Sequence, residues 1–150
     1  ADLFRMTTTN NDDLNIGQKL EYALANFEYV APMLYPSHYP KNFMGLGDPN
    51  LHVYDVVKIS IDRALERAIS TTTVQQIPGS RIASTSPPLY SKSSFSANKL
   101  RPWLQDNNYP VIYTAEMVRA QIQATYDSGI TSWALWNAGN RYTRGALLTE

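Results

Sequence analysis

Aromatic, hydroxyl, amide and imidazole side chains gather at the ends of three short apolar runs of the sequence: Tyr35, Ser37, His38, Trp103, Gln105, Trp136 and Asn137. Sugar rings stack their faces on aromatic rings, and their hydroxyl groups need amide, hydroxyl and imidazole partners. This combination predicts a carbohydrate site, with all of these residues as candidate substrate-binding residues.

Arg101 is a further candidate for substrate binding, because it lies inside the second apolar run, 99–105. A guanidinium turned into a protein needs a carboxylate partner, since its desolvation would otherwise cost several kcal/mol. Asp2 is the candidate partner within this chain, and exposure of Arg101 at a wet rim is the alternative. Asp106 is another carboxylate near the run, although the two asparagines behind it are typical of a plain turn.

Several other chemistries are disfavoured. The chain has 13 basic and 13 acidic residues, so no long-range field favours nucleic acid or an anionic membrane. There is no cysteine, and neither His38 nor His52 shares a ligand-like spacing with a carboxylate, so we expect no metal site and no cofactor. No glycine-rich phosphate loop or G-x-S-x-G motif occurs, and no apolar run reaches the ~20 residues of a membrane span.

The elements that must position these residues alternate between strand and helix, which predicts an α/β fold with a parallel sheet. Strands are expected at 1–4, 29–35, 99–105 and 130–136. Pro32 is the one objection to the second strand, because a proline removes a ladder hydrogen bond.

Helices are expected between these strands. One should carry apolar residues from Ile16 to Phe27 with Asp12 or Asp13 as its cap, and the longest should run from about 53 to 68. A third should begin at a Thr114 cap, and a short helix should close the chain. The Ser/Thr/Pro-rich segment 70–98 is too polar to fold alone and is expected to be a mobile insertion away from the site.

Three ordered motifs carry a family resemblance: Val30-Ala-Pro-Met-Leu-Tyr-Pro-Ser-His-Tyr39, Arg101-Pro-Trp-Leu-Gln105 and Trp133-Ala-Leu-Trp-Asn-Ala138. In these motifs the chain resembles an uncharacterised bacterial family described as putative glycoside hydrolases. Such proteins have a TIM-barrel glycosidase-like domain that is distantly similar to the alpha-amylase clan. The resemblance covers nearly the whole chain except the Ser/Thr segment.

The resemblance implies that residues 1–150 form the C-terminal part of a (β/α)8 TIM barrel, about three and a half βα units in length. An O-glycosyl hydrolase of this kind takes one carboxylate from strand four and an acid from strand five, and Asp2 is the residue that matches the strand-five position. The active site would then be incomplete in this chain. Its partners would be a carbohydrate substrate and either the missing N-terminal half of the barrel or a second copy of the chain.

Within such a barrel, alternation along each strand assigns the side chains to two faces. Val30, Leu34, Leu100 and Leu104 should face the helices, and the residues between them should face the barrel axis. Trp133 should also pack in the helix layer. Trp103, Trp136 and Tyr35 can be interpreted either as a sugar platform or as ordinary barrel filling.

Two functions remain open. The first is a glycoside hydrolase acting on an oligo- or polysaccharide, in which Asp2 takes part in acid/base catalysis. The second is a non-catalytic carbohydrate-binding or structural cell-surface domain. The residues leave the cellular location open, and the resemblance favours an extracellular or cell-envelope location.

Overall fold

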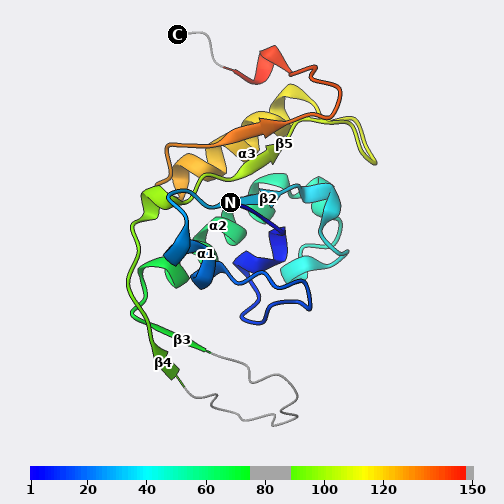
Figure 1. Ribbon diagram of the computed structural model, residues 1–150. Coiled ribbons are helices and arrows are strands. Elements are labelled where there is room, and N and C mark those ends of the chain that lie inside the picture. Colours follow the sequence, from blue (N-terminus) through cyan, green and yellow to red (C-terminus); the bar gives the residue numbers. More distant parts are fainter. Residues whose placement is uncertain (75–88, 148–150) are drawn as a thin grey trace.

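The computed structural model describes residues 1–74 and 89–147 and has a four-stranded parallel sheet as its centre (Figure 1). Its strands, in spatial order, are β1 (Asp2–Leu3), β2 (Ala31–Leu34), β5 (Trp103–Gln105) and β6 (Ala134–Trp136). Every neighbouring pair is parallel, so the predicted α/β class with a parallel sheet is confirmed.

Helices connect these strands: α1 (Leu20–Asn26), α2 (Val53–Ile69) and α3 (Ala115–Asp127). Helix α2 contacts both α1 and α3, and α2 and α3 lie behind the strands in Figure 1. The apolar side of α2 is buried as its 3.6-residue period predicts, and Thr114 caps α3 by accepting a hydrogen bond from the Met117 amide. Across the described residues, no helix is long and apolar enough to cross a membrane.

Short 3-10 turns stand where the chain leaves the strands. They are η1 (Arg5–Thr8) after β1, followed by η2 (Pro36–His38), η3 (Phe43–Gly45) and η4 (Pro49–Leu51) between β2 and α2. Turn η5 (Ala97–Lys99) leads instead into β5, and η6 (Arg144–Ala146) follows β6. The last of these replaces the closing helix expected from the sequence, so the described end of the chain is a single turn.

The first helix begins later than predicted. Asp12 and Asp13 accept hydrogen bonds from the backbone amides of Leu14 and Asn15, two residues on, and so form turns of their own. Leu14, Asn15 and Gly17 then have positive φ values of 55°, 55° and 72°, which an α-helix does not allow. Helix α1 therefore starts at Leu20, and the prediction of an aspartate cap was wrong.

Pro32 lies inside β2 and is buried there. The sheet accommodates it because pairing between β2 and β5 is made on either side of it, at the Val30–Leu100 bridge and at the Met33–Trp103 pair. The proline removes one ladder bond on the β5 side without removing the strand, so the Val30–Leu100 bridge stands apart from the pairs that begin at Met33.

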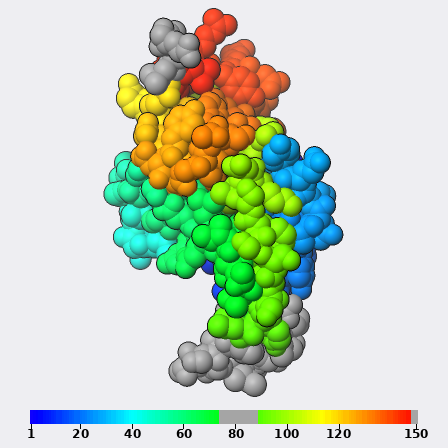
Figure 2. Space-filling model, turned by 90° about the vertical axis from the view of Figure 1, so that its left-hand side faces the viewer, coloured from blue at the N-terminus to red at the C-terminus, as the bar shows by residue number. Residues whose placement is uncertain are grey.

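The described flanks of the Ser/Thr/Pro-rich segment extend away from the sheet (Figure 1). These flanks form an antiparallel pair, β3 (Thr72–Val74) with β4 (Leu89–Ser91), and residues 75–88 lie outside the described part of the chain. Figure 2 views the molecule from the side where the strands begin, and the hairpin projects there from the lower end. The expected mobility of 70–98 stays a prediction.

Candidate functional site

The two faces of the sheet have opposite characters. On the helix side, Val30, Leu34, Leu100 and Leu104 are buried, as the alternation along the strands predicted. On the other side, a second set of residues is only partly covered: Ala31, Met33, Trp103 and Ala134. Trp133 packs towards the helices, with its ring 6.5 Å from that of Tyr126 in α3. The sheet therefore has one open face of mixed aromatic and small side chains.

Asp2 lies on this open face and is held by an aromatic neighbour. The indole Nε1 of Trp103 donates a hydrogen bond of 2.9 Å to its carboxylate Oδ1, across 101 residues of sequence. Trp103 in turn meets the edge of Trp136, with ring centroids 6.0 Å apart and planes at 85°. The carboxylate is exposed, and Trp136 remains 44% exposed, so a ligand can reach both.

Tyr35 connects this pair of tryptophans to the loops beyond β2. Its side chain is 7% exposed, and burial raises the pKa of its phenol, with the negative charge of Asp2 adding to the rise. The phenol therefore stays protonated at neutral pH. We call Asp2, Tyr35, Trp103 and Trp136 the Asp2 cluster.

His38 is the next ring along. Its centroid lies 5.5 Å from that of Tyr35 and 6.0 Å from that of Tyr109, both in edge-on arrangements. Partial burial lowers the pKa of its imidazole, and the positive charge of Arg5 lowers it further. A neutral imidazole can donate one hydrogen bond and accept another, which suits a sugar hydroxyl.

Ser37 and Gln105 are brought together as the sequence predicted, but they bond to each other. The Gln105 side chain is fully buried, and its Oε1 accepts from both the amide (3.2 Å) and the hydroxyl (2.9 Å) of Ser37. Its Nε2 donates to the carbonyls of Asn107 and Tyr109. Gln105 therefore fixes the loops after β2 and β5 in place, with its side-chain hydrogen bonds already made.

Asn137 and Asp106 form a second internal network. The Asn137 Nδ2 donates to the carbonyls of Asp106 and Arg141, and its Oδ1 accepts from the Gly139 amide. The buried carboxylate of Asp106 accepts from the amide and the hydroxyl of Thr143. Both side chains hold the segment after β6 against β5, so Asp106 is engaged as a structural acceptor.

Arg101 lies two residues before β5, at the end of the strand opposite to Gln105. Its guanidinium sits 4.0 Å above the ring of Tyr29, and its buried Nε has no hydrogen-bond partner in the described chain. The structure does not pair Arg101 with Asp2, its candidate partner, because the guanidinium lies over Tyr29 while the Asp2 carboxylate accepts from Trp103. An aromatic face, rather than a carboxylate, accommodates the positive charge.

Two residues beyond the carboxyl ends of the strands were not singled out from the sequence. Arg5, the first residue of η1, places its guanidinium 4.4 Å from the ring of Phe4 and 5.5 Å from that of Tyr39. Tyr109 contacts His38 from the loop after β5 and is 58% exposed. An aromatic residue directly before Pro110 could have pointed to Tyr109. The two asparagines in front of it had instead indicated a plain turn.

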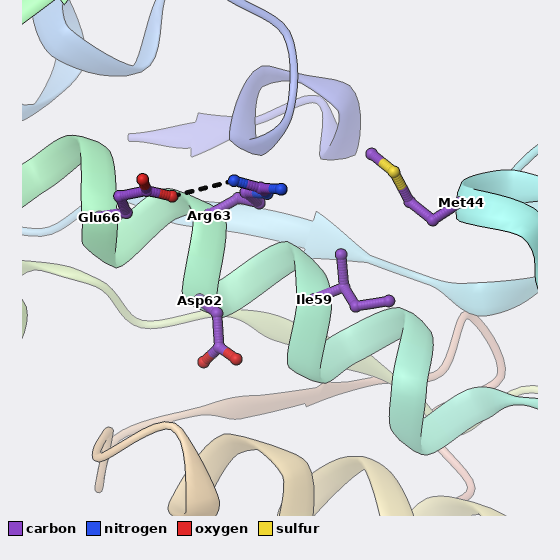
Figure 3. A pocket seen from close by; sticks show the side chains of 5 residues that line it. All are labelled: Met44, Ile59, Asp62, Arg63 and Glu66. Atoms are coloured by element: carbon purple, nitrogen blue, oxygen red, sulfur yellow. Dashed lines mark hydrogen bonds and ion pairs between the residues drawn. The ribbon is translucent and has the colours of Figure 1, made fainter.

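A separate open pocket runs along α2, and Figure 3 shows its lining: Met44, Ile59, Asp62, Arg63 and Glu66. Arg63 and Glu66 form a solvent-exposed ion pair of 3.1 Å there, and none of the lining residues belongs to the Asp2 cluster. Within residues 1–74 and 89–147, no group of three histidine or acidic side chains is placed to hold a metal ion.

The comparisons with known proteins gave one finding. A family model described as "Putative glycosyl hydrolase domain" matches residues 1–142 of the chain. No curated protein and no solved structure matches it.

Proposed function

We propose that this chain, which belongs to the glycosyl hydrolase domain family matched over residues 1–142, acts on an oligo- or polysaccharide through the Asp2 cluster. The observation that carries the proposal is the hydrogen bond from Trp103 Nε1 to the exposed Asp2 carboxylate on an open aromatic face. Glycoside cleavage uses carboxyl groups placed against the bound sugar, and aromatic rings supply the surface on which sugar rings stack.

We further propose that the sheet is part of a (β/α)8 barrel. The four parallel strands follow one another in sequence order across the sheet, and α2 packs beside both α1 and α3. In a (β/α)8 barrel each new strand is added on the same side of the one before it, as here. In a doubly wound sheet the direction of addition changes at one point, so this order supports a barrel. The open face would then be the barrel interior, and the loops after the strands would form its mouth.

In this arrangement Asp2 would donate a proton to the glycosidic oxygen as the bond to the anomeric carbon breaks, and water would supply the new hydroxyl. Glycoside hydrolysis normally needs a second carboxylate, about 5 Å away for retention or 6.5–9.5 Å for inversion. Asp106, the other carboxylate at the described mouth, is occupied by Thr143. We propose that the second carboxylate belongs to the half of the barrel that this chain does not contain.

The competing proposal is a carbohydrate-binding domain without hydrolytic activity. It is favoured by the shortage of unengaged polar groups, since Ser37, Gln105, Asp106 and Asn137 are bonded within the described chain. An aromatic mouth with one exposed carboxylate, that of Asp2, can bind sugar without cleaving it.

One experiment separates the two functions. The whole protein encoded by the gene that contains this chain is assayed against a panel of glucans and cell-wall polysaccharides, together with its Asp2→Asn variant. Loss of one essential carboxylate should lower kcat by at least about a hundredfold. The matched control is Asp62→Asn, since Asp62 pairs with Lys58 on the exposed side of α2.

Hydrolysis that survives in the Asp62 control and disappears in the Asp2 variant would support the hydrolase. Binding without turnover in the parent and both variants would instead establish a carbohydrate-recognition domain. Equal hydrolysis by the parent and the Asp2 variant would remove Asp2 from the mechanism.

A further inference from the structure

The loop between β5 and α3 presents apolar side chains to solvent at the mouth. Tyr109 is 58% exposed and Ile112 is 74% exposed, and Val111 between them is exposed as well. In Figure 1 this loop extends past the arrowhead of β5, on the side where η2 to η4 also lie. Exposed apolar side chains that adjoin one another, as these three do, are a feature of binding sites.

The loop is held firmly although its tip is exposed. Gln105 Nε2 donates to the carbonyl oxygens of Asn107 (3.0 Å) and Tyr109 (3.1 Å), and Gln105 is itself fully buried. The side chain of Asn108 accepts from the Tyr113 amide at 2.8 Å, which closes the loop from the other side. A ring held in advance by such bonds loses little conformational entropy when a ligand stacks on it.

Tyr109 is also the outer end of a row of rings. From Tyr109 the row passes to His38 at 6.0 Å and to Tyr35 at 5.5 Å. Trp103 contacts Asp2 through a hydrogen bond, and Tyr35 follows directly after β2, the strand that pairs with both β1 and β5. Trp136 continues the row beyond Trp103. Three rings therefore lead from the β5–α3 loop to the end of β2, and two tryptophans stand at the Asp2 carboxylate on the neighbouring strands.

We propose that Tyr109 and His38 form an outer sugar subsite, so that the ligand is an oligosaccharide chain extending from the tryptophans, past Asp2, to the β5–α3 loop. This inference rests on the proposed function and deepens it, because it assigns the substrate to the class of extended chains rather than single sugars or disaccharides. His38 supplies hydrogen bonds, Tyr109 supplies the stacking face, and Gln105 is a positioning residue that fixes the two relative to each other.

The test uses binding alone, so that it does not depend on turnover. In the Asp2→Asn background of the whole protein, the affinities for a disaccharide and a hexasaccharide of β-1,4-linked glucose and of β-1,4-linked N-acetylglucosamine are measured by titration calorimetry. Replacing Tyr109 by alanine should weaken hexasaccharide binding about tenfold and leave disaccharide binding unchanged. The backbone carbonyl that Gln105 holds is retained, so the loop should stay in place.

Two further variants make the result specific. Tyr109→Phe keeps the ring and should bind the hexasaccharide like the parent. Tyr90→Ala removes an exposed tyrosine of β4, outside the ring row, and should change nothing.

The proposal is overturned if the alanine variant binds both lengths as the parent does, if it loses both equally, or if the parent binds no probe. The proposed hydrolysis can fail separately, because an Asp2→Asn protein that still cleaves polysaccharide could nevertheless show the length-dependent loss at Tyr109.

Discussion

At the scale of single residues, the strongest anchor in the described chain is Arg67, which ties α2 to the segment that follows β1. Its guanidinium forms a bidentate pair with Glu21 of α1, at 2.8 and 2.7 Å, and donates to the carbonyls of Thr7 and Asn10. Burial by itself raises the pKa of Glu21, but hydrogen bonds and charge from Arg67 outweigh it, and the net pKa lies below the ordinary value. The position of β1, and hence of Asp2, depends on this pair.

Replacing Glu21 by glutamine should therefore destabilise the protein by about 3 kcal/mol at pH 7, because Arg67 would be left largely buried without its counter-charge. A carboxyl whose folded pKa is depressed contributes its stability above the unfolded value of about 4.3 and loses it as the pH falls through the folded value. In urea unfolding, the difference in free energy of unfolding between parent and variant should thus be largest at pH 7 and should shrink below about pH 4.

The exposed Arg63–Glu66 pair provides the control, since Glu66→Gln should change stability by less than about 0.5 kcal/mol. A gap for Glu21→Gln that stays constant from pH 7 to pH 3 would argue against this assignment of the pKa.

At the scale of elements, the end of β5 is held by a side chain of helix α3. This side chain bonds to backbone groups that would otherwise pair with a neighbouring strand. Gln121 of α3 is fully buried, and it accepts from the Gln105 amide and donates to the Gln105 carbonyl, both at 2.9 Å. The helix therefore fixes the strand end from which the Gln105 side chain reaches Ser37 and the Tyr109 loop. The hydrogen bonds between Gln121 of α3 and Gln105 of β5 therefore help to position the candidate site, although Gln121 lies outside it.

Gln121→Leu should accordingly cost about 2–3 kcal/mol, because two buried backbone groups of Gln105 would lose their partners. The matched control is Gln123→Leu, at an exposed position of the same helix, where the lost bond to Asp127 should cost about 0.5 kcal/mol or less. Thermal unfolding of the two variants side by side measures the difference, and equal melting temperatures would show that Gln121 does not hold β5.

At the scale of the whole molecule, the sheet has one covered face and one open face, with β1 and β6 at its two edges. Met33, Trp103 and Trp136 lie on the open face, and an unpaired edge next to such a face favours pairing with another sheet. Ala31, Met33, Trp103 and Ala134 on this face are only partly covered, whereas the side chains on the helix side are buried. The partly covered face and the unpaired edges of β1 and β6 therefore favour either self-association of the chain or pairing of the sheet with further strands.

We therefore expect the 150-residue chain on its own to associate with increasing concentration in sedimentation experiments. Met33→Lys should reduce this association, because a charge on the open face opposes sheet-to-sheet packing, and it should not lower the melting temperature of the isolated chain. In the whole protein the same substitution should destabilise, because a barrel would bury the lysine.

Leu51→Lys, at an exposed position in η4, is the control and should affect neither property. A parent chain that stays monomeric at all concentrations and melts cooperatively would contradict the barrel proposal and favour a smaller open α/β sheet.

The sequence by itself determined the alternation of strands and helices, the extents of α2 and α3, and the faces of Val30, Leu34, Leu100 and Leu104. These follow from periods of two and 3.6 residues, which are local properties that each segment carries alone. The same periodicity predicted the open face for Trp103 and Trp136, whereas Asp2 was singled out from the family resemblance.

Only the tertiary structure decided how the polar residues are used. Gln105 meets Ser37 across 68 residues, Trp103 meets Asp2 across 101, and Asn137 meets Asp106 across 31. Which donor finds which acceptor depends on the order of the strands and on the loops beyond them, and no local pattern encodes that order. For this reason the sequence predicted the right neighbourhood for Gln105 and Asn137 but not their internal bonds, and it missed Tyr109, whose exposure arises from a loop fixed by a distant side chain.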